Sequence, residues 1–317
     1  MSLTVVGSIA FDSVRTPFGE RDRMLGGSTV HFSLAARFFT EVRVVGPVGD
    51  DFGDDELKVL EDRGVITDDI ERVGGGQTFF WRAHYEYDMN VAHTDDTQLN
   101  VFADFDPKLS EAAKQSELLF LGNIDPELQQ SVRASSQAQF AALDSMNFWL
   151  ANARESLVAA IADVDCLMLN DAEIRELTGE PNLARAARAA MERGPGVIVA
   201  KRGEYGAALF SGEEFFAIPG YLLEDVRDPT GAGDSFAGGF LGYLDSRRAA
   251  GGSILDPAIL RQAMAYGSVL ASFNVEDFGT ERVQALTMEE IEERLRDFQR
   301  ITRFEVGSAP TQPSGAN

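Results

Sequence analysis

The residues best suited to chemistry in this sequence are a glycine-rich turn and the carboxylate that follows it. Asp228–Phe240 reads DPTGAGDSFAGGF, and the small residues Gly231–Gly233 let a ligand approach the backbone closely. The apolar spacing after Asp234 predicts a helix whose N-terminal amides favour a bound anion such as phosphate. Asp234 in the first turn could orient an attacking hydroxyl beside that phosphate and accept its proton.

A purely structural interpretation of these residues stays open, with Asp234 as a helix cap and the glycines as a tight turn. Two familiar nucleotide motifs are excluded. The sequence contains no Gly-Lys pair and therefore no Walker A loop. A dinucleotide fingerprint is excluded as well, because Phe236 replaces its third glycine and Asp234 would repel a pyrophosphate.

The longer stretch Asp228–Leu241, DPTGAGDSFAGGFL, resembles the C-terminal signature of the ribokinase-like (PfkB carbohydrate kinase) family at every constrained position. This resemblance implies that Asp234 is the catalytic base of a phosphoryl transfer from ATP. It also implies an anion hole formed by Gly231, Ala232 and Gly233. Two further residues, Thr230 and Asp228, would flank the phosphates.

Three further segments resemble the nucleotide half of the family. Asn170-Asp171-Ala172-Glu173 is similar to its Asn-x-x-Glu motif, which implies that Asn170 and Glu173 position Mg²⁺; on the residues alone a helix cap is favoured. The loop KRGEYG is similar to the nucleotide loop, but a lysine, either a phosphate contact or a solvated side chain, stands where threonine is common. The residues of this loop implied to bind the nucleotide are Lys201, Gly203 and Gly206. The third segment, Ala271–Gly279, aligns with the base pocket of the family, which implies Asn274 and Gly279 as base-pocket residues. The implied cofactors are ATP and Mg²⁺, with a monovalent cation as a further candidate.

Segments near the N-terminus resemble the acceptor-binding segments of the family. Gly7–Asp12 matches the opening strand, and the Asp12 carboxylate can accept hydrogen bonds from two vicinal hydroxyls. The Gly-Gly loop is matched at Gly26 and Gly27, but His31 stands where sugar kinases commonly carry asparagine. The candidate acceptor residues are Asp12, Gly26, Gly27, His31 and, from an aromatic strand-like segment, Arg82.

Short apolar runs alternate with helical patterns, which predicts a mostly parallel sheet covered by helices on both faces. We expect strands at Leu3–Val6, Val42–Val45, Leu118–Leu121, Ala141–Asp144, Cys166–Leu169, Val197–Ala200 and Ala207–Phe210. We expect helices at Val30–Phe39, Asp54–Arg63, Ala151–Ala162, Asp171–Thr178, Leu183–Arg193, Pro257–Phe273 and Thr287–Arg300. The family resemblance implies a ribokinase-like three-layer α/β/α sandwich with a mostly parallel central sheet, which we assign to residues 1–306, followed by a disordered tail at 307–317.

The segment Gln77–Phe102 lacks a helical period and predicts antiparallel strands apart from the main sheet. Together with Val14–Met24 it could form a small β-sheet lid that excludes water. A plain β-excursion or a homodimer contact through exposed strand edges explains the pattern equally well. Strand alternation puts Arg82 and Trp81 on opposite faces. If the face with Arg82 points toward the site, it offers a charged donor that suits a sugar. If the face with Trp81 does, it offers a ring on which a nucleobase could stack, and we favour the sugar.

Composition limits the partners of the protein. The 317 residues carry a formal net charge of −23, which would repel nucleic acid and anionic membranes. No apolar run approaches the roughly 18 residues of a membrane span, and the N-terminus resembles a strand, not a signal peptide. The single cysteine, Cys166, allows no intrachain disulfide, which favours a cytoplasmic location. The acidic, lysine-poor composition suits either concentrated salt or an ordinary acidic cytoplasmic enzyme.

We therefore predict an ATP-dependent kinase that transfers the γ-phosphoryl group to a hydroxyl of a sugar or sugar-like acceptor. Two alternatives remain. A nucleoside kinase of the same family acts on an acceptor with a similar ribose diol, and a catalytically silent family member would serve as a sensor or scaffold. The intact Asp234 and Gly231–Gly233 argue against the silent alternative.

Overall fold

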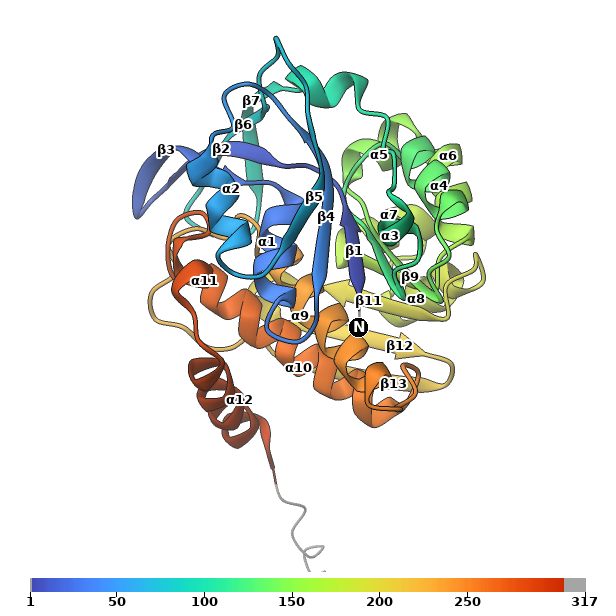
Figure 1. The fold of residues 1–317 in the computed structure, drawn as a ribbon. Helices are drawn as coiled ribbons and strands as arrows, with labels where there is room; N and C mark the ends of the chain where they lie inside the picture. Colours follow the sequence, from blue (N-terminus) through green and yellow to red (C-terminus); the bar gives the residue numbers. More distant parts are fainter. Residues whose placement is uncertain (1, 305–317) are drawn as a thin grey trace, which may run out of the picture.

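A computed structural model describes residues 2–304, and its core is a nine-stranded sheet between two layers of helices (Figure 1). The strand order is β13-β12-β11-β10-β9-β8-β1-β4-β5, and every neighbouring pair from β11 to β5 is parallel. The two strands at the other edge, β12 and β13, are antiparallel. The strands are β1 (Leu3–Val6), β4 (Val42–Val48), β5 (Ile66–Arg72), β8 (Leu118–Leu121), β9 (Phe140–Asp144), β10 (Cys166–Asn170), β11 (Val197–Lys201), β12 (Ala207–Ser211) and β13 (Glu214–Ile218).

Each face of this sheet has its own hydrophobic core, because the central strands are apolar on both sides. One core packs against α1 (Ser28–Ala36), α2 (Asp54–Glu61), α9 (Ala232–Ala249), α10 (Pro257–Asn274), α11 (Glu281–Ala285) and α12 (Met288–Thr302). The other packs against α3 (Glu111–Lys114), α4 (Pro126–Ser135), α5 (Asn147–Asn152), α6 (Arg154–Ala162), α7 (Asp171–Thr178) and α8 (Leu183–Met191). The three-layer sandwich predicted from the sequence is confirmed.

A second sheet of four strands stands beside the main sheet, as the aromatic segment predicts. Its order is β3 (Gly19–Gly26), β2 (Ala10–Thr16), β6 (Phe79–Tyr85) and β7 (Ala92–Gln98). The central pair β2–β6 is parallel and the outer pairs are antiparallel. We call this sheet the lid. Its free edges are β3 and β7, so dimerisation through them stays a prediction.

Several elements differ from the expected ones. The helix expected at Ala151–Ala162 is two helices, α5 and α6, because Ala153 has φ −141° and ψ 40°, outside the helical region. Strands β5 and β13 were not expected, since both lie at sheet edges and are half exposed, so an apolar pattern is missing. Helix α4 was also missed, although Asp125 and Pro126 form a regular helix start.

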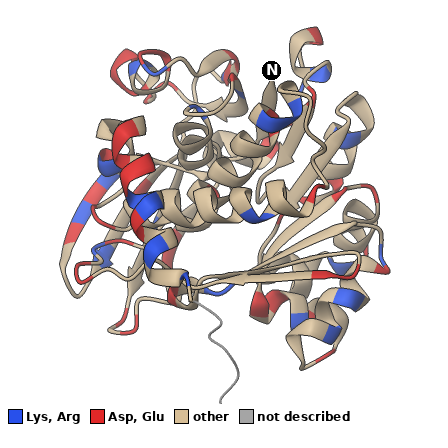
Figure 2. Ribbon diagram, turned by 90° about the horizontal axis from the view of Figure 1, so that it is seen from below, with Lys and Arg blue, Asp and Glu red and all other residues tan. Residues whose placement is uncertain are grey.

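The surface carries the acidic character of the sequence. Asp and Glu lie mainly on helices and loops at the outside of the molecule, with Lys and Arg among them (Figure 2). Within residues 2–304, none of the helices combines the length and apolarity needed to cross a bilayer. The tail predicted at 307–317 lies outside the described residues.

Candidate active site

Asp234 lies in the first turn of α9, as the sequence predicts. The helix begins after Gly231, which has φ 74° and ψ 1°, a left-handed conformation that glycine adopts without strain. The amides of the first turn therefore point away from the helix, beside the Asp234 carboxylate. Burial raises the pKa of Asp234 to about 7, and the nearby Asp144 charge adds to this, while Lys201 opposes it. A carboxylate with this pKa is suited to proton transfer near neutral pH.

The loop before α9 is held from behind by two buried polar side chains. Asp228 accepts hydrogen bonds from the amides of Thr230 (2.9 Å) and Gly279 (3.0 Å). Asn274 donates its amide to the Thr230 carbonyl oxygen at 2.6 Å and accepts a bond from Ser235 Oγ at 3.0 Å. Both Asp228 and Asn274 are buried. The structure therefore places Asn274 beneath the loop, where it fixes the backbone, and not in an open base pocket.

His31 supports the same loop from α1. Its Nδ1 lies 2.9 Å from Asn274 Oδ1, and a Cβ placed on Gly231 would lie only 2.2 Å from that nitrogen. Since Asn274 Oδ1 can only accept, Nδ1 carries the proton, and the buried Nε2 keeps an unpaired acceptor site among the described residues. Burial lowers the pKa of His31 to about 4, so the ring is neutral. The packing explains why residue 231 must be glycine.

Lys201 and Asp144 form an ion pair next to residues 228–233, the loop before α9, which we call the anion loop. Their Nζ and Oδ2 atoms are 2.6 Å apart, and Nζ would lie 3.2 Å from a Cβ on Gly233. Burial opposes the charge of Lys201, but Asp144 outweighs it and raises the lysine pKa, with smaller contributions from Glu173 and Asp234. Lys201 is therefore a positive charge beside Gly233, and its contact with a phosphate stays a prediction. Sequence reasoning missed Asp144, although it ends a buried strand of the parallel sheet, a usual place for site residues.

Asn170 and Glu173 form a reciprocal capping box at the start of α7. The Asn170 side chain accepts from the Glu173 amide (2.8 Å), and Glu173 Oε2 accepts from the Asn170 amide (2.9 Å). Burial, with the Asp144 charge second, raises the pKa of Glu173 to about 7. Within residues 2–304, no group of three or more His, Cys, Asp or Glu is arranged to hold a metal. Mg²⁺ needs only one or two carboxylates when phosphates and water complete its shell, so these residues fit it, and the metal role stays a prediction.

Asp12, the carboxylate predicted to bind the acceptor, lies in β2. Its side chain is buried, and Oδ2 lies 3.4 Å from the amide of Gly27, whose φ of 92° precedes α1. A Cβ on Gly26 would lie 2.0 Å from the same oxygen, so only glycine fits there. Burial raises the pKa of Asp12 to about 7, with smaller contributions from the charges of Asp228 and Asp234.

The lid presents Trp81, not Arg82, on the face of Asp12. In the β2–β6 register Asp12 pairs with Trp81 and Ser13 with Arg82, and paired residues share a face of the sheet. Tyr85 lies on the Trp81 face, and its hydroxyl is 3.2 Å from Thr230 Oγ1 in the anion loop. The expectation that the Arg82 face looks toward the acceptor is therefore wrong for this structure.

The predicted nucleotide loop follows β11 as a short 3₁₀ turn, Gly203–Tyr205. Gly203 has φ 56° and Gly206 has φ 86°, and a Cβ on Gly206 would lie 2.1 Å from the Ile218 carbonyl oxygen. The glycine spacing is therefore required by the turn and by close packing on the end of β13. A contact of these glycines with a nucleotide stays a prediction.

Residues 21–285 match the model of the pfkB family carbohydrate kinases, and this span covers most of the chain. The chain belongs to this family. It is therefore a phosphotransferase, and the ribokinase-like resemblance seen in its sequence is confirmed.

Curated relatives of this PfkB-family kinase include enzymes with two kinds of acceptor. It is 27% identical to a cytidine kinase of Thermococcus kodakarensis over 78% of this chain and 90% of the relative. It is 26% identical to a nucleoside kinase of Methanothermobacter thermautotrophicus over 88% and 91%. It is also 28% identical to a ribokinase of Lactococcus lactis over 75% and 82%.

Solved structures agree on the fold. A Methanocaldococcus jannaschii nucleoside kinase of the ribokinase family aligns with a TM-score of 0.75 at 20% identity, over 93% of this chain and 98% of the other. An Escherichia coli ribokinase II in complex with ATP and Mg²⁺ aligns with a TM-score of 0.75 at 19% identity, over 93% and 99%. At this identity the likeness concerns the fold alone.

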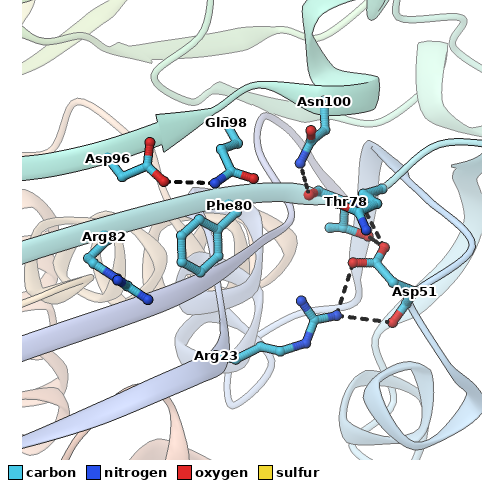
Figure 3. A pocket seen from close by; sticks show the side chains of 9 residues that line it. Arg23, Asp51, Thr78, Phe80, Arg82, Asp96, Gln98 and Asn100 are labelled. Carbon is cyan, nitrogen blue, oxygen red and sulfur yellow. Dashed lines mark hydrogen bonds and ion pairs between the residues drawn. The ribbon is translucent and has the colours of Figure 1, made fainter.

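Arg82 lines a separate cavity of about 310 Å³ on the Phe80 face of the lid of this PfkB-family kinase (Figure 3). The cavity lies on the face opposite Asp12 and Trp81. Its other arginine, Arg23, is paired with Asp51 at 2.9 Å, and Arg82 faces Asp22 at 3.6 Å. Both arginines of this cavity therefore already have a carboxylate partner within the protein.

Proposed function

We propose that this protein is a nucleoside kinase, which transfers the γ-phosphoryl group of ATP to a hydroxyl of the ribose. The observation that carries the proposal is the position of Trp81 beside Asp12 on one face of the lid. A buried carboxylate suits a ribose diol, and an indole ring next to it suits a base. This replaces the preference for a free sugar, which depended on Arg82 facing the site.

The environment of Trp81 supports a binding surface. The side chain is half-buried and does not belong to either hydrophobic core, whereas the neighbouring Phe80 packs against the core on the other face. Its indole Nε1 donates to Thr94 Oγ1 of β7 at 3.2 Å, which orients the ring plane. An oriented, partly exposed aromatic ring loses little conformational freedom when a base stacks on it.

The chain's own residues account for the steps of the transfer. Asp12 and the Gly26–Gly27 turn hold the ribose diol, and Asp234 accepts the proton of the attacking hydroxyl. The first-turn amides of α9 and the Lys201 ammonium stabilise the negative charge that develops on the phosphoryl oxygens. When bound, ATP supplies the phosphoryl group and Mg²⁺ offsets its charge. Asn170 and Glu173 would hold that metal through water.

The relatives named as cytidine and nucleoside kinases are consistent with this proposal, and those named as ribokinase and deoxyribokinase define its competitor. A ribokinase-type acceptor would use the diol site of Asp12 but leave the face of Trp81 uncovered. The two functions therefore differ in what touches the indole.

The test measures kcat/KM for cytidine, inosine and adenosine against ribose, deoxyribose and a hexose. We expect a nucleoside to exceed every sugar by at least about fivefold, the low end for one stacked base. Trp81→Ala should lower kcat/KM for that nucleoside by about five- to a hundredfold, the range for loss of one aromatic platform. It should leave the low activity on ribose unchanged.

Arg82→Ala is the matched control, because Arg82 is adjacent in sequence but lies on the opposite face. It should change neither activity. A free sugar preferred over every nucleoside, or an effect of Arg82→Ala larger than that of Trp81→Ala, would contradict the proposal and restore the sugar kinase.

A further inference from the structure

The arm formed by the end of β6, the turn at residues 86–91 and the start of β7 touches two loops on the predicted nucleotide side of the site. At the end of β6, the Tyr85 hydroxyl lies 3.2 Å from Thr230 Oγ1, directly before the anion-hole residue Gly231. At the turn, Asn90 Nδ2 donates to Glu204 Oε1 at 3.0 Å, on the 3₁₀ turn after β11. A Cβ on Gly203 would lie 2.6 Å from Asn90 Oδ1, so the arm rests directly on that turn.

The side-chain hydroxyl is the group of Thr230 that contacts the lid. Its amide is held by Asp228 and its carbonyl oxygen by Asn274, so its backbone is fixed on both sides. The hydroxyl is the group left to contact the lid, and Tyr85 is its partner there. Burial raises the pKa of Tyr85 far above its ordinary value, with the charges of Asp228 and Asp12 adding to it, so the phenol stays neutral and either hydroxyl can donate in this contact.

We propose that Tyr85 is a positioning residue that couples the acceptor lid to the phosphate loop through Thr230. A lid closed over the acceptor holds Thr230 in place for the phosphates, and bound nucleotide holds the lid closed by the same contact. The coupling is reciprocal, so each ligand should tighten binding of the other by the same factor. The inference rests on the proposed kinase function, but not on which acceptor is correct.

The main experiment compares Tyr85→Phe with wild type and with Tyr87→Phe. Tyr87 lies on the same arm but is 90% exposed, so its hydroxyl is a matched control. The dissociation constant of the non-transferable analogue AMP-PNP is measured with and without the best acceptor from the panel above. We expect wild type and Tyr87→Phe to bind AMP-PNP more tightly with acceptor. In Tyr85→Phe that ratio should fall by about two- to twelvefold, toward one, as for loss of one hydrogen bond.

A second measurement needs no acceptor. Hydrogen exchange of the arm amides 86–91 is followed with and without AMP-PNP, and AMP-PNP should protect them in wild type and Tyr87→Phe but not in Tyr85→Phe. Unchanged coupling and protection in Tyr85→Phe, or equal losses in Tyr87→Phe, would overturn the proposal. Activity on no member of the panel would instead count against the proposed function, and the exchange experiment would still decide the role of Tyr85.

Discussion

The Lys201 ammonium lies 2.6 Å from Asp144 Oδ2, and this ion pair joins the carboxyl ends of β11 and β9 across β10. The two members of the pair have opposite effects on the pKa of Asp234, the predicted base. The Asp144 charge raises the pKa of Asp234, whereas the Lys201 charge lowers it. Burial raises the pKa of Asp234 most, and these two residues on different strands modify it in opposite directions.

The first prediction concerns Asp234 as the base. Asp234→Asn should lower kcat by at least about a hundredfold, the low end for loss of a general base, while ATP binding persists. In the wild type, kcat should fall below about pH 7, because protonation of Asp234 removes the base and burial raises its pKa to about 7. A variant with near-normal turnover, or a wild-type rate that is flat from pH 5 to 8, would contradict this role.

Two substitutions in the ion pair should shift the acidic limb of the kcat–pH profile, the range in which kcat falls as the pH decreases, in opposite directions. Asp144→Asn removes the charge that raises the Asp234 pKa, so the limb should move to lower pH. Lys201→Met removes the charge that lowers it, so the limb should move to higher pH and kcat/KM for ATP should fall. The measurement is kcat against pH at saturating substrates. Shifts in the same direction would show that the pair does not control Asp234.

Gly231→Ala should lower activity by displacing the anion hole, in addition to the stability that alanine loses in a left-handed backbone conformation. A Cβ there would lie 2.2 Å from the His31 ring, and its φ of 74° is strained for alanine. Gly179→Ala is the control, since its φ is 72° but nothing lies within 4 Å. Both should lose about 1–2 kcal/mol of stability from the left-handed backbone. Only Gly231→Ala should lose activity, by about a hundredfold for a displaced anion-hole donor. Equal activities would show that the packing of His31 against Gly231 does not support the anion hole.

Glu173→Gln tests whether the capping box also serves a metal. The substitution removes the negative charge and weakens a cap, at a cost of about 0.5–2 kcal/mol in stability. If Glu173 holds hydrated Mg²⁺, the Mg²⁺ concentration for half-maximal rate should rise. Glu176→Gln, exposed on the same helix, should change neither quantity. A stability loss with an unchanged Mg²⁺ titration would leave Glu173 a helix cap alone.

The net charge of −23 predicts a salt response. Self-repulsion among acidic surface groups is screened as ionic strength rises, so the melting temperature should increase between low salt and molar KCl. Differential scanning calorimetry across a KCl series measures this. A flat or falling melting temperature would favour an ordinary acidic enzyme over one adapted to concentrated salt.

The sequence by itself determined the parallel sheet, the lid segments and the local chemistry of the anion loop. These depend on short-range physics: continuous apolar runs make buried strands, and glycines before a helical pattern create free amides next to Asp234. The reciprocal cap of Asn170 and Glu173 is local in the same sense. Elements that lack such a pattern, the half-exposed edge strands β5 and β13, could not be predicted this way.

Tertiary structure decided which distant residues meet. Alternation along β6 separates Trp81 from Arg82, but only the register with β2 shows that Trp81 shares the face of Asp12. The pairing of Asp144 with Lys201 and the burial of Asn274 under Thr230 join segments that are far apart in sequence. Contacts of this kind arise from how the layers and the lid pack together, and no local spacing records them.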